Sequence, residues 1–201
     1  MQLFYSPASP FARKCLVTLR ETGQLDEAEL VHVVGTPLDS SGMPTSHNPL
    51  GKLPALSRPD GPAIYDSRVI CRFLDARKNA GLYPEGRIWE TLTLEATGDG
   101  IMDAAVLMVY EGRCRPEDRR SPEWVEAQWA KVTRALGALT AKWQSHLAGP
   151  LDAGQIAVGC ALGYLDFRHG DRDWRKGQDA LAAWYAEFAE RPSMQATVPV
   201  A

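Results

Sequence analysis

A proline at the start of a short predicted strand is the feature that most constrains this chain. Residues 48–56 read NPLGKLPAL, so a loop ends in Leu53-Pro54 and a small apolar run follows. Proline cannot donate to a sheet ladder, which confines it to the start or edge of a strand. A cis Leu53–Pro54 bond would leave the backbone of Leu53 free to pair with an extended peptide ligand. The dipeptide alone favours the trans form, since only about 5–6% of X-Pro bonds are cis.

The segments around this proline predict a small mixed domain. A Pro-Asp-Gly turn at 59–61 indicates a hairpin between short strands. Ser9 is placed to cap a helix that has Pro10 at its first position. In chain order we predict a strand at 2–5, a helix at 10–22, a strand at 30–34, two short strands around the turn, and a helix at 67–78.

Beyond a Gly- and Pro-containing linker at 79–87, every pattern is helical. Apolar residues at three- and four-residue spacing predict helices at 89–113, from Ser121-Pro122 onward, and at 178–190. Another helix opens at Asp152, where Gln155 completes a variant of the capping box. Gly98 and Gly100 cost the first of these helices about 1 kcal/mol each, so we expect a packing or functional reason for them.

Composition excludes several classes of function. The net charge is −3, which gives no electrostatic basis for binding nucleic acid or an anionic membrane. No apolar run approaches the roughly 20 residues of a membrane span, and we recognise no signal peptide. The four cysteines are widely spaced, without a CxxC or metal-ligand pattern, so we expect no metal site and reduced thiols in a cytoplasmic protein.

The pattern NPLGKLPAL, followed by Asp66-Ser67 at a helix start, resembles the glutathione-binding half of the glutathione S-transferases. The second half is similar too, in GDGIMDAAVLM at 98–108, ALGYLDFR at 161–168 and ERPSM at 190–194. The resemblance, to bacterial cytosolic transferases that use a serine, implies a thioredoxin-like α/β domain at 1–78 and an all-α domain at 88–201. Gln155 stands where the family usually has Asp, and we expect only a modest effect on stability.

The resemblance also implies a glutathione site. In the family the loop proline is cis, as expected here for Pro54, and the backbone of the residue before it, here Leu53, pairs with the cysteinyl part of glutathione. Asp66 and Ser67 would bind the γ-glutamyl end, although the family more often has Glu before that Ser. Lys52, beside the proline loop, is the best placed cation for a glutathione carboxylate, ahead of His47 and Arg13.

Ser9 is the candidate that activates the glutathione thiol. Its hydroxyl could donate to a sulfur lying over the helix start, and related transferases carry their activating Ser or Cys immediately before a Pro-Phe pair, as here. A plain N-cap explains the same local motif. Tyr5 and Ser6 remain alternatives, because some transferase classes use a Tyr at the end of the first strand or a Ser nearer to it.

The electrophile should lie between the two halves. Met102, Val106 and Tyr110 share one helical face, and Tyr164 and Trp174 are further candidates. Apolar stripes at this spacing more often belong to a core. An ion contact between Arg13 and Asp99 or Asp103 across the domains is a further possibility that the sequence leaves open.

The resemblance therefore implies a glutathione transferase acting in detoxification, with glutathione as co-substrate, a small apolar electrophile and a homodimeric assembly. Two alternatives stay open. One is a non-catalytic binding or regulatory protein of the same fold, which would often lack the hydroxyl or thiol at the helix start. The other is a glutathione-dependent reductase or dehalogenase, which would differ mainly in the electrophile pocket.

Overall fold

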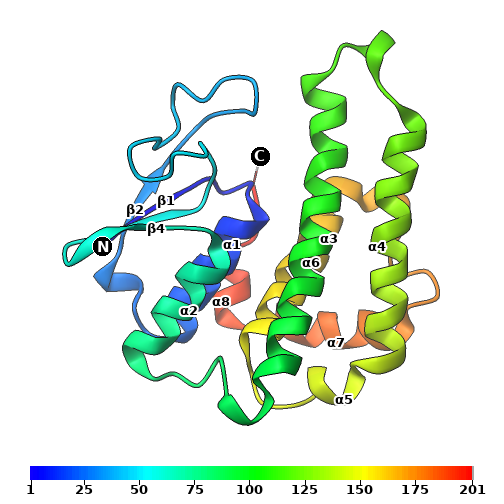
Figure 1. Ribbon diagram of the computed structural model, residues 1–201. Coiled ribbons are helices and arrows are strands. Elements are labelled where there is room, and N and C mark those ends of the chain that lie inside the picture. The colour runs from blue at the N-terminus through cyan, green and yellow to red at the C-terminus, as the bar shows by residue number, and fades with distance from the viewer. Residues whose placement is uncertain (201) are drawn as a thin grey trace.

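The computed structural model describes residues 1–200, which form a mixed four-stranded sheet with its helices and then a helical domain (Figure 1). This confirms the predicted fold class. The first part contains β1 (Gln2–Tyr5), α1 (Pro10–Glu21), β2 (Glu29–His32), β3 (Ala55–Arg58), β4 (Gly61–Ile64) and α2 (Ser67–Lys78).

The strand order β2-β1-β3-β4 brings distant segments to one edge of the sheet. Strand β1 is parallel to β2 and antiparallel to β3, with Phe4 opposite Ala55. Strands β3 and β4 are also antiparallel, with Leu56 opposite Ile64. The end of β1, the start of β3 and the end of β4 therefore meet at the same edge. The Leu53–Pro54 bond at this edge is cis, as the family resemblance implied.

Local capping sets the limits of the two helices that pack against the sheet. Ser9 caps α1, Asp66 caps α2, and each side chain accepts a hydrogen bond from a backbone N–H of the first turn. Helix α2 ends where Asn79 takes the left-handed conformation. The core between helices and sheet contains fully buried side chains from both layers: Leu3, Leu19, Leu56, Ile70 and Leu74.

The helical domain is built on a long pair, α3 (Ile88–Cys114) and α4 (Pro122–Lys142), which run side by side in Figure 1. The other helices are α5 (Gln144–Leu147), α6 (Ala153–His169), α7 (Asp179–Ala189) and α8 (Pro192–Gln195). Helices α5 and α8 were not predicted, because four residues are too few to show a helical period.

The two glycines of α3 have different surroundings. A Cβ on Gly98 would lie 2.7 Å from the carbonyl carbon of Ala157 in α6. At the same crossing, a Cβ on Gly154 would lie 2.8 Å from the Leu94 Cβ. Gly100 has no such neighbour within 4 Å among the described residues. The expected packing reason therefore exists for Gly98, where α3 and α6 cross closely, and not for Gly100.

Gln155 closes the capping box of α6 and also binds three backbone carbonyls that precede this helix. Asp152 accepts from the Gln155 N–H at 3.1 Å, and the Gln155 side-chain oxygen accepts from the Asp152 N–H at 2.7 Å. The Gln155 amide nitrogen also donates to the carbonyls of His146, Leu147 and Gly149, at 2.9–3.2 Å. The predicted capping box is confirmed, and the amide joins α6 to the end of α5.

Candidate functional site

Ser9 lies at the N-terminus of the twelve-residue helix α1, with extended backbone angles. Its hydroxyl oxygen accepts a hydrogen bond from the Ala12 N–H at 3.2 Å, and its own N–H donates to the Ser6 carbonyl at 3.0 Å. Because the hydroxyl acts as an acceptor in the cap, its proton is left to donate elsewhere. The N-cap reading and a role toward a ligand are therefore compatible.

A buried amide shapes the proline loop. Asn48 is only 2% exposed, its amide donates to the Lys52 carbonyl at 2.8 Å, and its side-chain oxygen accepts from the Leu50 N–H at 3.1 Å. These bonds hold the turn that leads into Leu53-Pro54. Sequence reasoning gave Asn48 no role, although an Asn that bonds the backbone two residues on is typical of a turn. The Lys52 side chain is exposed to solvent.

Asp66 and Ser67 stand at the start of α2. The Asp66 carboxylate accepts from the Arg68 N–H at 3.0 Å and from the Arg68 guanidinium at 2.8 Å. Partial burial works against ionisation of Asp66, but these Arg68 contacts outweigh it and lower the pKa of the carboxyl. Ser67 is buried, and its carbonyl oxygen lies 3.9 Å from the Cys15 Sγ, which holds the start of α2 against α1.

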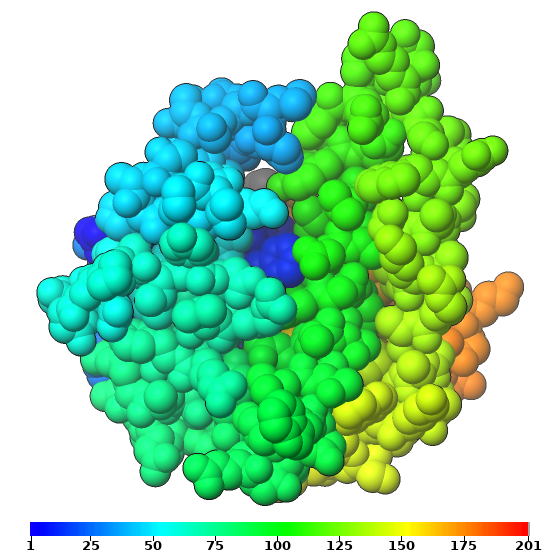
Figure 2. Space-filling model, in the orientation of Figure 1, coloured from blue at the N-terminus to red at the C-terminus, as the bar shows by residue number. Residues whose placement is uncertain are grey.

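These residues converge because of the strand order described above. The chain leaves β1 toward Ser9, enters β3 from Leu53-Pro54, and leaves β4 toward Asp66-Ser67, all at one sheet edge. Figure 2 shows a hollow between this part of the chain, in blue and cyan, and α3, in green. The arrangement offers backbone groups, a hydroxyl and a carboxylate around a common space.

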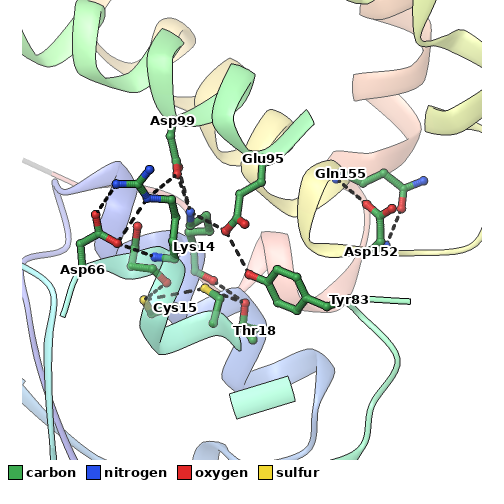
Figure 3. A network of polar contacts seen from close by, with 12 residues as sticks. Lys14, Cys15, Thr18, Asp66, Tyr83, Glu95, Asp99, Asp152 and Gln155 are labelled. Atoms are coloured by element: carbon green, nitrogen blue, oxygen red, sulfur yellow. Dashed lines mark hydrogen bonds and ion pairs between the residues drawn. The ribbon is translucent and has the colours of Figure 1, made fainter. Parts of the chain in front are cut away.

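A buried ion cluster joins the two domains below this site (Figure 3). Lys14 of α1 is 1% exposed and bonds Glu95 at 2.9 Å and Asp99 at 2.8 Å, both on α3. Burial opposes the charge on Lys14, but Asp99 and Glu95 overcome it and raise the pKa of the amine. Burial raises the pKa of Glu95 despite Lys14, and the Tyr83 hydroxyl donates to Glu95 at 3.0 Å.

The ion contact that the sequence left open is thus made by Lys14, with Asp99 as its partner, and not by Arg13. Arg13 donates instead to the Met194 carbonyl at 3.1 Å. Asp103 is exposed. Neighbouring side chains on a helix point about 100° apart, so the rotation of α1 decides which one faces α3. Arg68 extends the cluster toward the site, its Nε lying 3.7 Å from the Asp99 carboxylate.

The candidates for the electrophile pocket divide into two groups. Val106 is half-buried and Tyr110 is 38% exposed, so both present surface on α3. Met102 is fully buried, and Tyr164 and Trp174 are 4% and 3% exposed, so these three belong to the core. Helical spacing does not distinguish a core face from a pocket face, so a role for these three in the electrophile pocket stays a prediction.

Within residues 1–200, no group of His, Cys, Asp and Glu side chains is arranged to hold a metal ion. Over the same residues, no helix is long and apolar enough to cross a membrane. The cysteines are all free thiols, and Cys15 is fully buried beside Cys71, as expected for a structural residue. Burial raises the pKa of the Cys15 thiol well above its ordinary value.

Comparison with known proteins defines the class. The family model of the glutathione S-transferase N-terminal domain matches residues 8–77, and that of the C-terminal domain matches residues 122–187. The chain therefore belongs to the glutathione S-transferase family.

Among particular relatives, the chain is 30% identical to an uncharacterised GST-like protein of Escherichia coli K12, YibF, over 99% of this chain and 98% of that protein. It is 45% identical to a glutathione transferase family member from Pseudomonas fluorescens Pf-5, solved with bound glutathione, covering 100% and 99% of the two chains with a TM-score of 0.96. A glutathione S-transferase from Methylobacillus flagellatus KT, also solved with glutathione, is 38% identical over 99% of both chains, with a TM-score of 0.87.

Proposed function

We propose that this protein is a glutathione transferase that joins the glutathione sulfur to a small apolar electrophile. The observation that carries the proposal is Ser9, a hydroxyl with a free proton at a helix N-terminus, at the same sheet edge as the cis-proline loop. The glutathione bound in the relatives from Pseudomonas fluorescens and Methylobacillus flagellatus supports it.

In this proposal glutathione binds in an extended conformation beside the proline loop, where the ends of β1 and β4 meet the start of β3. The backbone N–H and C=O of Leu53, before the cis Pro54, pair with the cysteinyl residue. The Asp66 carboxylate, kept ionised by Arg68, accepts from the γ-glutamyl ammonium, and Ser67 donates to the γ-glutamyl carboxylate. Lys52, exposed beside the loop, pairs with a carboxylate of the tripeptide.

The protein must then ionise the bound thiol. A free thiol of pKa about 8.5 is only about 3% ionised at neutral pH, and lowering that pKa by two units takes about 2.7 kcal/mol. A helix N-terminus supplies about 0.3–1 kcal/mol, or up to about 2 in a partly buried site. A hydrogen bond to a charged group supplies about 1.5–3 kcal/mol. The α1 dipole and the Ser9 hydroxyl together reach the required sum.

The reaction needs no further cofactor. The thiol proton passes to solvent, the thiolate attacks the electrophilic carbon, the C–S bond forms, and the leaving group departs with its electron pair. We place the electrophile against Val106 and Tyr110, which offer surface on α3. The complex of the Pseudomonas fluorescens relative with S-(propanoic acid)-glutathione supports a pocket that accepts small S-substituents.

We further propose a detoxifying role in the cytoplasm, as a homodimer. The free thiols of Cys15 and Cys71, close together and unbonded, support a reducing compartment. Large apolar side chains on the surface support an assembly: Val69 is 48% exposed, Leu50 67% and Trp89 77%. A monomer by light scattering at micromolar concentration would contradict the dimer.

The deciding experiment compares Ser9→Ala with the wild type, and uses Ser6→Ala as the matched control. We follow the ultraviolet absorption of bound thiolate across pH and the turnover of a chlorodinitrobenzene. Loss of a charge-assisted hydrogen bond predicts a raised thiolate pKa and a fall in kcat of about tenfold to a hundredfold for Ser9→Ala. Ser6→Ala should behave as wild type. An unchanged thiolate pKa and full turnover in Ser9→Ala would refute the role of Ser9.

Calorimetry with Ser67→Ala tests the binding half separately. The variant should weaken glutathione binding while the proteins stay folded, as checked by circular dichroism. If the wild type fails to bind glutathione at millimolar concentration, the protein has the fold of a transferase without its glutathione site. The search would then turn to protein partners.

A further inference from the structure

A second hollow lies between α1, the helical domain and the C-terminal segment. It has a volume of about 290 Å³, and its walls come from α1, α6, α7, α8 and residues 198–199. Its lining includes Arg13, Gly163, Phe167, Tyr185, Met194 and Val198. None of these is a residue of the proposed glutathione site or electrophile pocket.

Arg13 is the unusual member of this lining. The residue is 5% exposed, and its guanidinium donates from Nη2 to the Met194 carbonyl at 3.1 Å and from Nε to the Thr197 hydroxyl at 3.4 Å. Within residues 1–200, Nη1 is buried without a hydrogen-bond partner. A buried cationic donor left unpaired is costly, and native structures rarely keep one without a reason. Nη1 therefore makes no hydrogen bond of good geometry, although Arg13 lies near the Tyr185 hydroxyl and opposes the rise that burial causes in the pKa of that group.

Gly163 of α6 leaves the space into which this donor reaches. A Cβ at position 163 would collide with Arg13 Nη1 and lie 2.7 Å from the Tyr185 hydroxyl oxygen. The guanidinium of α1 and the hydroxyl of α7 thus converge over the same bare stretch of α6. Two donors that converge in this way suit an acceptor with two oxygens.

The other side chains of the lining determine what kind of ligand body would fit the hollow. Phe167, Met194 and Val198 give the hollow an apolar lining. The Asp166 carboxylate also lines it, but that charge is already held by Arg175 at 2.8 Å and by the Trp174 indole N–H at 2.7 Å. The lining therefore combines the Arg13 guanidinium with apolar side chains.

We propose that this hollow binds a small organic monocarboxylate, whose carboxylate is held by Arg13 Nη1 and the Tyr185 hydroxyl and whose apolar body packs on Phe167, Met194 and Val198. The site goes beyond the proposed transferase function and does not depend on it. Its volume, just below the usual range for small-molecule pockets, suits a ligand about the size of an arylacetic acid.

The test uses phenylacetate as probe and phenylacetamide as its neutral counterpart, titrated into the full-length chain by calorimetry. We expect phenylacetate to bind and the amide to bind at least about tenfold more weakly, because a hydrogen bond to a charged group is lost. Saturating S-hexylglutathione should leave phenylacetate binding unchanged. Displacement by S-hexylglutathione would assign phenylacetate to the electrophile pocket and overturn the proposal.

Three variants and one control locate the site. Arg13→Gln and Tyr185→Phe should each weaken phenylacetate binding, the first by at least about tenfold. Arg20→Gln removes the same charge from an exposed position of α1 and should have no effect. Val198→Trp fills the hollow from the exposed C-terminal segment, so it should abolish binding even if Arg13→Gln fails to fold. No binding to folded wild type, equal binding of acid and amide, or undiminished binding to Val198→Trp would each overturn the proposal.

Discussion

Replacing Lys14 with methionine tests the buried cluster between the domains. Lys14 is 1% exposed and bonds two carboxylates, so its removal leaves Glu95, itself 1% exposed, with only the Tyr83 hydroxyl. The Asp99 carboxylate, by contrast, still has the Nε of Arg68 at 3.7 Å. Breaking a buried ion pair by removing one partner costs about 3–5 kcal/mol. Methionine is close to lysine in volume, so this cost is electrostatic and not a cavity effect.

Protonation of Glu95 in the Lys14→Met variant limits the loss of folding stability and makes that loss depend on pH. The ordinary pKa of this carboxyl is 4.5, so taking up a proton at neutral pH costs about 3.4 kcal/mol, at 1.36 kcal/mol for each pH unit. Burial already raises the folded-state pKa of Glu95, and removing Lys14 raises it further. Above pH 4.5 the folded variant then binds more protons than the unfolded chain, so its stability falls as pH rises.

The measurement is urea unfolding of wild type and Lys14→Met, followed by tryptophan fluorescence. We expect a loss of about 3 kcal/mol near pH 7.5, and a loss about 2 kcal/mol smaller near pH 5.5, where protonation is easier. Glu95→Gln in the Lys14→Met background should recover part of the stability, because the amide carries no charge and still accepts from Tyr83. Arg20→Met, on the exposed side of α1, should change stability by less than about 0.5 kcal/mol. A deficit below about 1 kcal/mol near pH 7.5, or one that is the same at both pH values, would refute the reasoning.

Two further predictions concern the helical domain. Gly98→Ala should destabilise the fold by about 1–3 kcal/mol, because the new methyl meets the α6 backbone, whereas Gly100→Ala should be neutral or stabilising by up to about 1 kcal/mol; equal urea midpoints for the two variants would contradict the close crossing. Gln155→Ala should cost about 2–4 kcal/mol, because the cap and three amide–carbonyl contacts are lost. Gln155→Asp keeps the acceptor without the amide donors, so its melting temperature should fall by a few degrees, and a rise of many degrees would contradict this account.

Much of the secondary structure could be predicted from the sequence, because its causes are local. Ser9-Pro10, Asp66-Ser67 and Ser121-Pro122 each mark a helix start, and the structure begins α1, α2 and α4 there. The capping box at 152–155 is likewise a matter of residues three apart. The fold class came from the resemblance of two separate halves of the chain, since periodicity alone does not order strands in a sheet.

The site was accessible from the sequence only in part. The residues around the cis Leu53–Pro54 bond stand in recognisable motifs, and the strand order brings them to one edge. Their roles toward glutathione remain predictions. Asn48 shapes the loop through hydrogen bonds to residues two and four positions further along the chain. The sequence contains this residue, but an Asn in such a place is typical of any turn.

Contacts between distant segments were decided by the tertiary structure alone. Lys14 and Arg13 are adjacent cations on one helix, yet one meets Glu95 and Asp99 while the other reaches Met194 and Gly163. Met102 and Val106 share a helical face, yet the first is fully buried and the second is half-buried. Caps and turns act within a few residues, so a sequence displays them. The rotation of one helix against another depends on packing across the whole core, and that rotation determines which side chain is buried, paired or free to meet a ligand.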